Sequence, residues 1–141
     1  MKTRKLKLTL LALLASVIVI ITLGSCSTKA QFLSSAVVPA ARGSVQISKD
    51  FNKNYVIKIN VYDLAGSDRL TPPRSTYVVW LVTADNRAKN IGQINTSNSL
   101  DASFETVSAF QPSKIMITAE DDANLLYPSY SEVILTTDYL R

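Results

Sequence analysis

Apolar and polar residues alternate with a period of two along much of the chain after residue 43. The alternation is clearest at residues 45–47, 55–61 and 115–119, and it is typical of half-buried β-strands. Further extended segments, bounded by turn-forming residues, are expected at 77–83, 90–95, 102–106 and 132–137. Seven short strands at this spacing predict an all-β fold, an immunoglobulin-like two-sheet β-sandwich.

Residues 100–111 fit two local structures. Asp101 can cap a helix that places Phe104 and Val107 on one side. The β-branched Val107 and the following Pro112 fit an extended chain better. We therefore expect a strand followed by a loop.

The segment 77–82 is apolar on both faces, so one face fills the core and the other must be covered. A tryptophan on a central strand of an immunoglobulin-like sandwich commonly lies in the core. The residues expected to point inward are Val78, Trp80 and Val82. The residues expected to point outward are Tyr77, Val79 and Leu81. The outward set is either a binding surface or the underside of the loop at residues 63–75.

The N-terminus has the layout of a secretory signal peptide. A basic cluster at residues 2–7 precedes an apolar run at residues 8–23. Sixteen residues are fewer than the roughly 20 that a membrane-spanning helix needs. We expect residues 1–25 to be a cleaved export signal.

The apolar run ends in Leu23-Gly24-Ser25-Cys26, which resembles the lipobox of bacterial lipoprotein precursors. Cys26 is the only cysteine of the chain and stands where the motif requires one. The resemblance implies that Cys26 carries a lipid and becomes the first residue of the mature protein. The alternatives are an ordinary signal peptide with a chance cysteine, or an uncleaved anchor.

A multiply acylated cysteine is a lasting membrane tether, whereas one acyl chain binds only marginally. The residue after the cysteine is Ser27. In Gram-negative lipoproteins an aspartate there often favours the inner membrane, so Ser27 points to the outer membrane. The expected location is the cell envelope, lipid-anchored, at the outer membrane facing the periplasm.

Residues 26–42 are rich in Ser, Ala and Thr and are expected to form a lipidated tether ahead of a sandwich domain at residues 43–141. A flexible chain of this length spans roughly 20 Å. The apolar residues Phe32, Leu33, Val37 and Val38 leave a second possibility open. They can dock on the domain as an edge strand or a short helix.

Charge and composition exclude several function classes. Residues 1–25 hold four of the fifteen basic residues and none of the eleven acidic ones, which leaves eleven of each afterwards. This balance argues against a nucleic-acid partner. Histidine is absent, and lipidation of Cys26 leaves no thiol, so catalytic bases and transition-metal ligands are scarce. We predict no enzyme, no catalytic residue, no metal and no cofactor.

Two short motifs remain as candidate sites. Glu120-Asp121-Asp122 is an acidic cluster that fits a solvated turn better than a calcium loop or a carboxylate pair. Tyr127 and Tyr130 flank a turn, where exposed rings can stack on a sugar or a peptide, although aromatic residues there more often pack on the domain.

The chain also resembles the extracytoplasmic C-terminal domain of anti-sigma-K factors. The residues that carry the resemblance are Pro72-Pro73, Tyr77, Trp80-Leu81, Ile91-Gly92, the stretch 115–120, and Pro128 followed by 133–135. That family also carries a cytoplasmic sigma-binding domain and a membrane-spanning helix, and neither is recognisable here. The resemblance therefore implies a sandwich with a recognition or structural role in the envelope, without direct sigma-factor binding.

These observations favour a membrane-anchored envelope lipoprotein whose sandwich is a non-catalytic binding or structural module. Its partners are the membrane, through Cys26, and an envelope protein or glycan. One alternative is an accessory modulator of an envelope-stress pathway of the anti-sigma type. Another is a carboxylate-dependent enzyme that acts on glycans or lipids.

Overall fold

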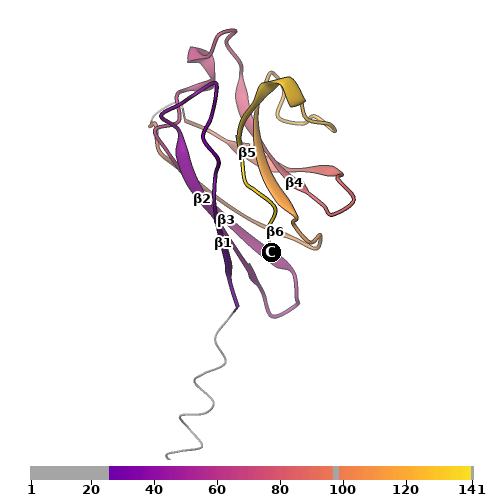
Figure 1. The fold of residues 1–141 in the computed structure, drawn as a ribbon. Coiled ribbons are helices and arrows are strands. Elements are labelled where there is room, and N and C mark those ends of the chain that lie inside the picture. The colour runs from indigo at the N-terminus through magenta and orange to yellow at the C-terminus, as the bar shows by residue number, and fades with distance from the viewer. Residues whose placement is uncertain (1–25, 97–98, 141) are drawn as a thin grey trace, which may run out of the picture.

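The computed structural model describes residues 26–96 and 99–140, so the predicted signal peptide lies outside the described residues. The described residues form eight strands in two four-stranded antiparallel sheets (Figure 1). The strands are β1 (Thr28–Gln31), β2 (Arg42–Lys49), β3 (Tyr55–Tyr62), β4 (Thr76–Val82), β5 (Ala88–Ile94), β6 (Ala102–Ser108), β7 (Lys114–Glu120) and β8 (Val133–Thr136). Two short 3-10 turns are η1 (Ser67–Arg69) and η2 (Tyr130–Glu132). The predicted β-sandwich is confirmed, with one strand more than expected.

One sheet has the order β1-β2-β3-β6 and the other the order β5-β4-β7-β8. The hairpins β2–β3 and β4–β5 stay within a sheet, whereas the connections after β3, β5 and β6 cross between sheets. The segment 100–111 contains β6, which pairs with β3 along its whole length. The expected strand and loop are therefore confirmed there.

The core between the sheets consists of side chains that alternate along the strands of both sheets. Its fully buried members include Ile57, Ile59, Val61, Tyr77, Val79, Leu81, Ile115 and Ile117. Tyr77 donates a hydrogen bond of 2.6 Å from its hydroxyl to the carbonyl oxygen of Ala65. The phenol thus satisfies its polar tip at the end of an apolar core.

The predicted orientation of β4 is wrong. Tyr77, Val79 and Leu81, expected on the surface, are fully buried between the sheets. Val78, Trp80 and Val82 of β4 face away from the other sheet and are buried in a second cluster. Met116 belongs to this cluster, and Leu125 packs against it.

The reversal has a physical reason. Trp80 carries an N–H group that needs an acceptor when buried, and its Nε1 donates to Thr118 Oγ1 of β7 at 2.8 Å. Residues 121–132 fold back over this outer face, and Leu125 packs against the cluster. The segment over the outer face is therefore 121–132, whereas the loop at 63–75 contributes Leu64 and Leu70 to the main core beside Tyr77. Both faces of β4 are buried, so the apolar pattern alone could not show which face points to the core between the sheets.

The segment expected as a flexible linker is docked on the domain. β1 pairs with β2, and Phe32 N–H then donates to Gly43 O at 3.0 Å. The next residue, Leu33, donates its N–H to Thr136 O of β8 at 2.8 Å. The chain therefore passes from one sheet to the other and closes the gap between their edges. The linker interpretation of residues 26–42 is wrong. The edge strand lies at Thr28–Gln31, ahead of the apolar residues that were expected to dock. Of those residues, Phe32 packs against the core and Val38 enters it, whereas Leu33 and Val37 are exposed.

Leu81→Ala tests the orientation of β4. Truncating a fully buried leucine should lower the free energy of unfolding by about 2–5 kcal/mol. The matched control is Leu126→Ala, whose side chain is 80% exposed and which should change stability by no more than about 0.5 kcal/mol. Urea denaturation measures both. Equal small effects would show that Leu81 points to solvent.

Tyr77 should make stability depend on alkaline pH. Burial, aided by the charge of Asp68, raises the pKa of Tyr77 from 10.0 to about 12. The unfolded chain therefore loses this proton first, and stability should fall as the pH rises from about 10 to about 12. Urea denaturation at pH 9 and pH 11 should show a smaller loss for Tyr77→Phe than for the unsubstituted protein. Identical losses would contradict the assignment.

Candidate functional site

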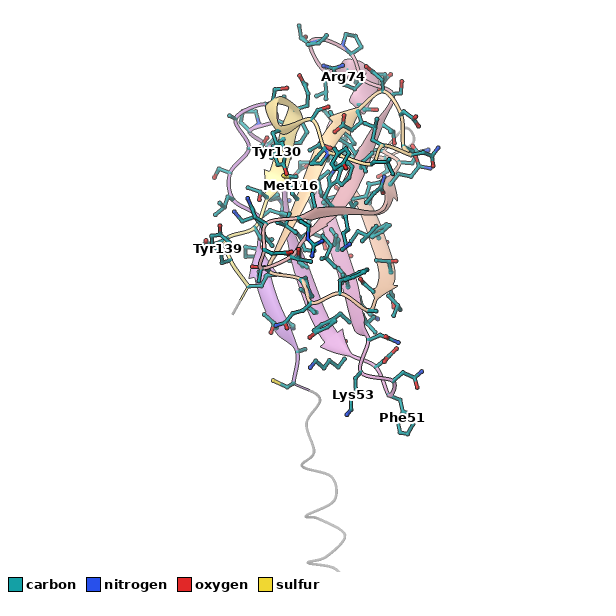
Figure 2. The ribbon with its side chains drawn as sticks, turned by 90° about the vertical axis from the view of Figure 1, so that its right-hand side faces the viewer. Phe51, Lys53, Arg74, Met116, Tyr130 and Tyr139 are labelled. Carbon is teal, nitrogen blue, oxygen red and sulfur yellow. The ribbon has the colours of Figure 1, made fainter. Side chains whose placement is uncertain are left out.

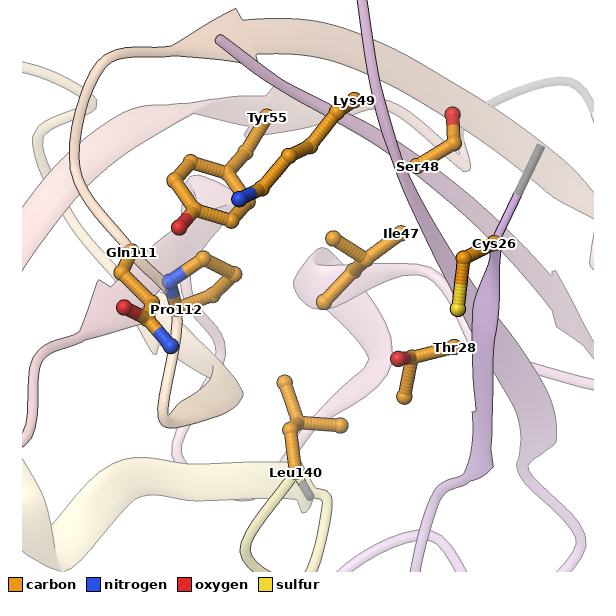
Figure 3. A pocket seen from close by; sticks show the side chains of 9 residues that line it. All are labelled: Cys26, Thr28, Ile47, Ser48, Lys49, Tyr55, Gln111, Pro112 and Leu140. Carbon is orange, nitrogen blue, oxygen red and sulfur yellow. The ribbon is translucent and has the colours of Figure 1, made fainter. Parts of the chain in front are cut away.

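A depression lies at the end of the sandwich where β1 begins. Its volume is about 440 Å³, and its lining comes from Cys26 and Thr28, from β2 and β3, from Pro112 and from Leu140. Figure 3 shows Ile47 and Leu140 pointing into this space, with the Cys26 sulfur at its edge. More of the lining is apolar than polar. The space adjoins the residue that sequence analysis assigns to lipidation.

Strand pairing fixes the position of Cys26 relative to this depression. Thr28 lies opposite Ile47 in the β1–β2 pairing, and both residues line the depression. Cys26 precedes β1 by two positions and is exposed. Lys49, the last residue of β2, also lines the depression, and its Nζ lies 5.2 Å from the centre of the Tyr55 ring. Cys26 thus stands at one end of the folded domain, with only Ser27 between it and the first strand.

The three predicted binding residues of β4 are unavailable for contact with a partner. Tyr77, Val79 and Leu81 have no exposed surface, because they form part of the main core. The other two predicted binding residues differ: Tyr127 is 79% exposed and Tyr130 is 64% exposed. Both belong to the segment 121–132 that covers the outer face of β4. The two tyrosines therefore do not pack on the domain, although that is the more common arrangement at such a turn.

The acidic cluster separates into three different environments. Glu120 is buried, and its carboxylate accepts hydrogen bonds from Thr118 Oγ1 at 2.6 Å, Ser129 N at 2.8 Å and Ser129 Oγ at 2.7 Å. Asp121 pairs with Arg74, and Asp122 accepts the N–H of Asn124. The three carboxylates therefore do not converge on one ligand. Glu120 instead fastens the segment 121–132 to β7.

Arg74 fastens the same segment from the other side. Its Nη1 lies 2.8 Å from Asp121 Oδ2, and its Nη2 lies 3.0 Å from Glu132 Oε1. The pKa of the Arg74 guanidinium is raised above its ordinary value, mainly by the hydrogen bond to Asp121 and to a smaller extent by the one to Glu132. The segment that carries Tyr127 and Tyr130 is thus held at both ends.

Neither a metal centre nor a membrane-spanning helix is found where the structure describes the chain. Across residues 26–96 and 99–140, no three His, Cys, Asp or Glu side chains gather closely enough to hold a metal ion. Over the same residues, no helix combines the length and the apolar character needed to cross a membrane.

Comparison of the chain with models of known protein families finds no match, and comparison with curated proteins finds none either. The resemblance to anti-sigma-K factors therefore stays a prediction. The candidate site has to be interpreted from its own residues.

Sequence analysis did not single out the β2–β3 turn, which lies at the same end as Cys26. Phe51 stands in this turn and is fully exposed, at 102% of its reference surface. The alternating strands on either side indicate a turn at 50–54, but the pattern does not reveal whether a turn residue packs on the domain. Only the folded arrangement identifies Phe51 as an unburied aromatic side chain.

Glu120→Gln tests the structural assignment of the acidic cluster. The amide group cannot accept all three hydrogen bonds, so the free energy of unfolding should fall by about 1–3 kcal/mol. The control Asp122→Asn changes an exposed carboxylate and should cost no more than about 0.5 kcal/mol. Equal effects in thermal denaturation would remove the structural role from Glu120.

Proposed function

We propose that the protein is a bacterial envelope lipoprotein, anchored through a lipid on Cys26, whose β-sandwich is a non-catalytic binding or structural module. The observation that carries the proposal is the place of Cys26. The sole cysteine closes a lipobox-like sequence, is exposed, and precedes the first strand by two residues. Cleavage before Cys26 would leave every described strand intact.

The way the domain is stabilised supports export without disulfides. A lipidated Cys26 leaves no other thiol, so the exported domain must rely on packing. Two buried apolar clusters supply that packing, and the hydrogen bonds of Glu120 add to it. Such a domain needs no disulfide to fold after export, and Ser27 after the lipidated residue favours the outer membrane as its site.

The binding role rests on the segment 121–132. Leu126, Tyr127 and Tyr130 are each more than 60% exposed, although Glu120 and Arg74 hold the segment in place. Exposed tyrosines on a fixed support lose little conformational entropy on binding and offer both apolar area and a hydroxyl group. An envelope protein or a glycan fits these side chains.

Cys26→Ala tests the anchor. Cells fed radioactive fatty acid should label the unsubstituted protein, and the variant should carry no label and leave the membrane fraction. The control Ser27→Ala changes the neighbouring residue and should keep both the label and the membrane association. Density-gradient separation of the two membranes should place the labelled protein in the outer one. Label that persists on Cys26→Ala would refute the lipoprotein proposal.

A further inference from the structure

The β2–β3 turn projects from the end of the sandwich that carries Cys26. Figure 2 shows Phe51 and Lys53 at the end from which the chain enters β1, with Arg74 at the opposite end. The turn is closed by hydrogen bonds from Asn54 N to Asp50 Oδ1 at 2.8 Å and from Lys53 N to Asp50 O at 3.0 Å. Phe51 is therefore presented to solvent by an ordered turn.

One exposed aromatic residue is ordinary on a protein surface. The distribution of charge around it is what gives Phe51 significance. Antiparallel pairing assigns the strand ends and loops of the described chain to two opposite ends of the sandwich. The charged residues separate between these two ends, although their total over the mature chain is balanced.

The basic residues of the Cys26 end are Lys49, Lys53, Arg87, Lys89 and Lys114, and its acidic residues are Asp50, Asp85 and Asp138. The basic residues of the opposite end are Arg42, Arg69 and Arg74, and its acidic residues are Asp63, Asp68, Asp101, Glu120, Asp121, Asp122 and Glu132. The Cys26 end therefore has an excess of two positive charges, and the other end an excess of four negative charges. Only Lys29, Lys58 and Glu105 lie between the two ends in the described residues.

We propose that the Cys26 end is a membrane-contact surface, on which Phe51 enters the headgroup region of a bilayer while Lys49 and Lys53 contact anionic phospholipids. This inference rests on the proposed lipid anchor at Cys26. With only Ser27 between the lipidated residue and β1, the anchor holds this end of the domain against the membrane. The flexible 20 Å spacer expected from the sequence would have left the domain free to turn.

Charge and chemistry select the occupant. A surface of anionic headgroups attracts a basic face and repels an acidic one, so it favours the orientation that the anchor already imposes. An aromatic side chain beside lysines suits the boundary between headgroups and acyl chains. The apolar depression between Ile47 and Leu140 faces the same boundary next to Cys26. The opposite end, with the exposed tyrosines nearer to it, then faces away from the membrane.

The test uses the protein purified from membranes and placed in phosphatidylcholine vesicles with or without phosphatidylglycerol. Asn52→Cys adds an exposed thiol to the turn for a fluorophore and keeps Phe51 and both lysines. The control Asp122→Cys adds one at the acidic end. Nitroxide-bearing lipids should quench the fluorophore at residue 52 several-fold more than the one at residue 122. The difference should shrink when Phe51→Ser is added or phosphatidylglycerol is left out.

Lys49→Gln with Lys53→Gln should lower the ratio of docked to undocked domains about 25-fold, since each lysine near an anionic surface contributes about fivefold. Equal quenching at the two positions, or quenching at residue 52 that ignores Phe51 and the anionic lipid, would overturn the membrane-contact surface. A protein partner at this end would give that second result.

The lipid anchor is judged separately. If the thiol of Cys26 in the unsubstituted protein reacts with the fluorophore, it carries no lipid, and the proposed function fails. If that thiol is blocked and the two positions are quenched equally, only the membrane-contact surface fails.

Discussion

The passage of the chain from one sheet to the other at Phe32 and Leu33 is the constraint on which the rest of the structure depends. Two consecutive N–H groups are bound by carbonyl groups of different sheets, Gly43 in β2 and Thr136 in β8. Val38 and Ala41 then enter the core before β2 begins. This seam closes an open edge of the sandwich and fixes β1, and β1 in turn fixes the position of Cys26.

A domain on a flexible spacer and a domain docked directly beside its attachment point present different surfaces to their surroundings. A domain on a long flexible spacer can turn freely, so the spacer holds no particular face of it against the membrane. With β1 docked, one end adjoins Cys26, and the proposed anchor there would give the charges and Phe51 at that end a defined neighbour. The segment 121–132, which Glu120 and Arg74 fasten, belongs to the remaining surface and is free to meet partners.

Much of the fold could be predicted, because alternation along strands such as β3 follows directly from burial on one face. The prediction failed where that signal is absent. β4 is apolar on both faces, and the usual core position of tryptophan selected the wrong one, since Trp80 finds its acceptor in Thr118 on the outer face. The pattern did not predict β1, because an edge strand of four residues, Thr28–Gln31, is held by backbone pairing and shows little apolar pattern.

The proposed site at Cys26 rests on a local sequence motif, whereas neither Phe51 nor the separation of charge could be predicted from the sequence. Both of these depend on which loops share an end of the sandwich, and the equal numbers of basic and acidic residues after residue 25 conceal the separation.

Hydrogen exchange at the backbone amides of Phe32 and Leu33 tests the central claim most directly. The docked seam predicts that both amides exchange as slowly as amides of the paired interior strands. Exchange as fast as in an unstructured peptide would contradict it and return residues 26–42 to a flexible tether.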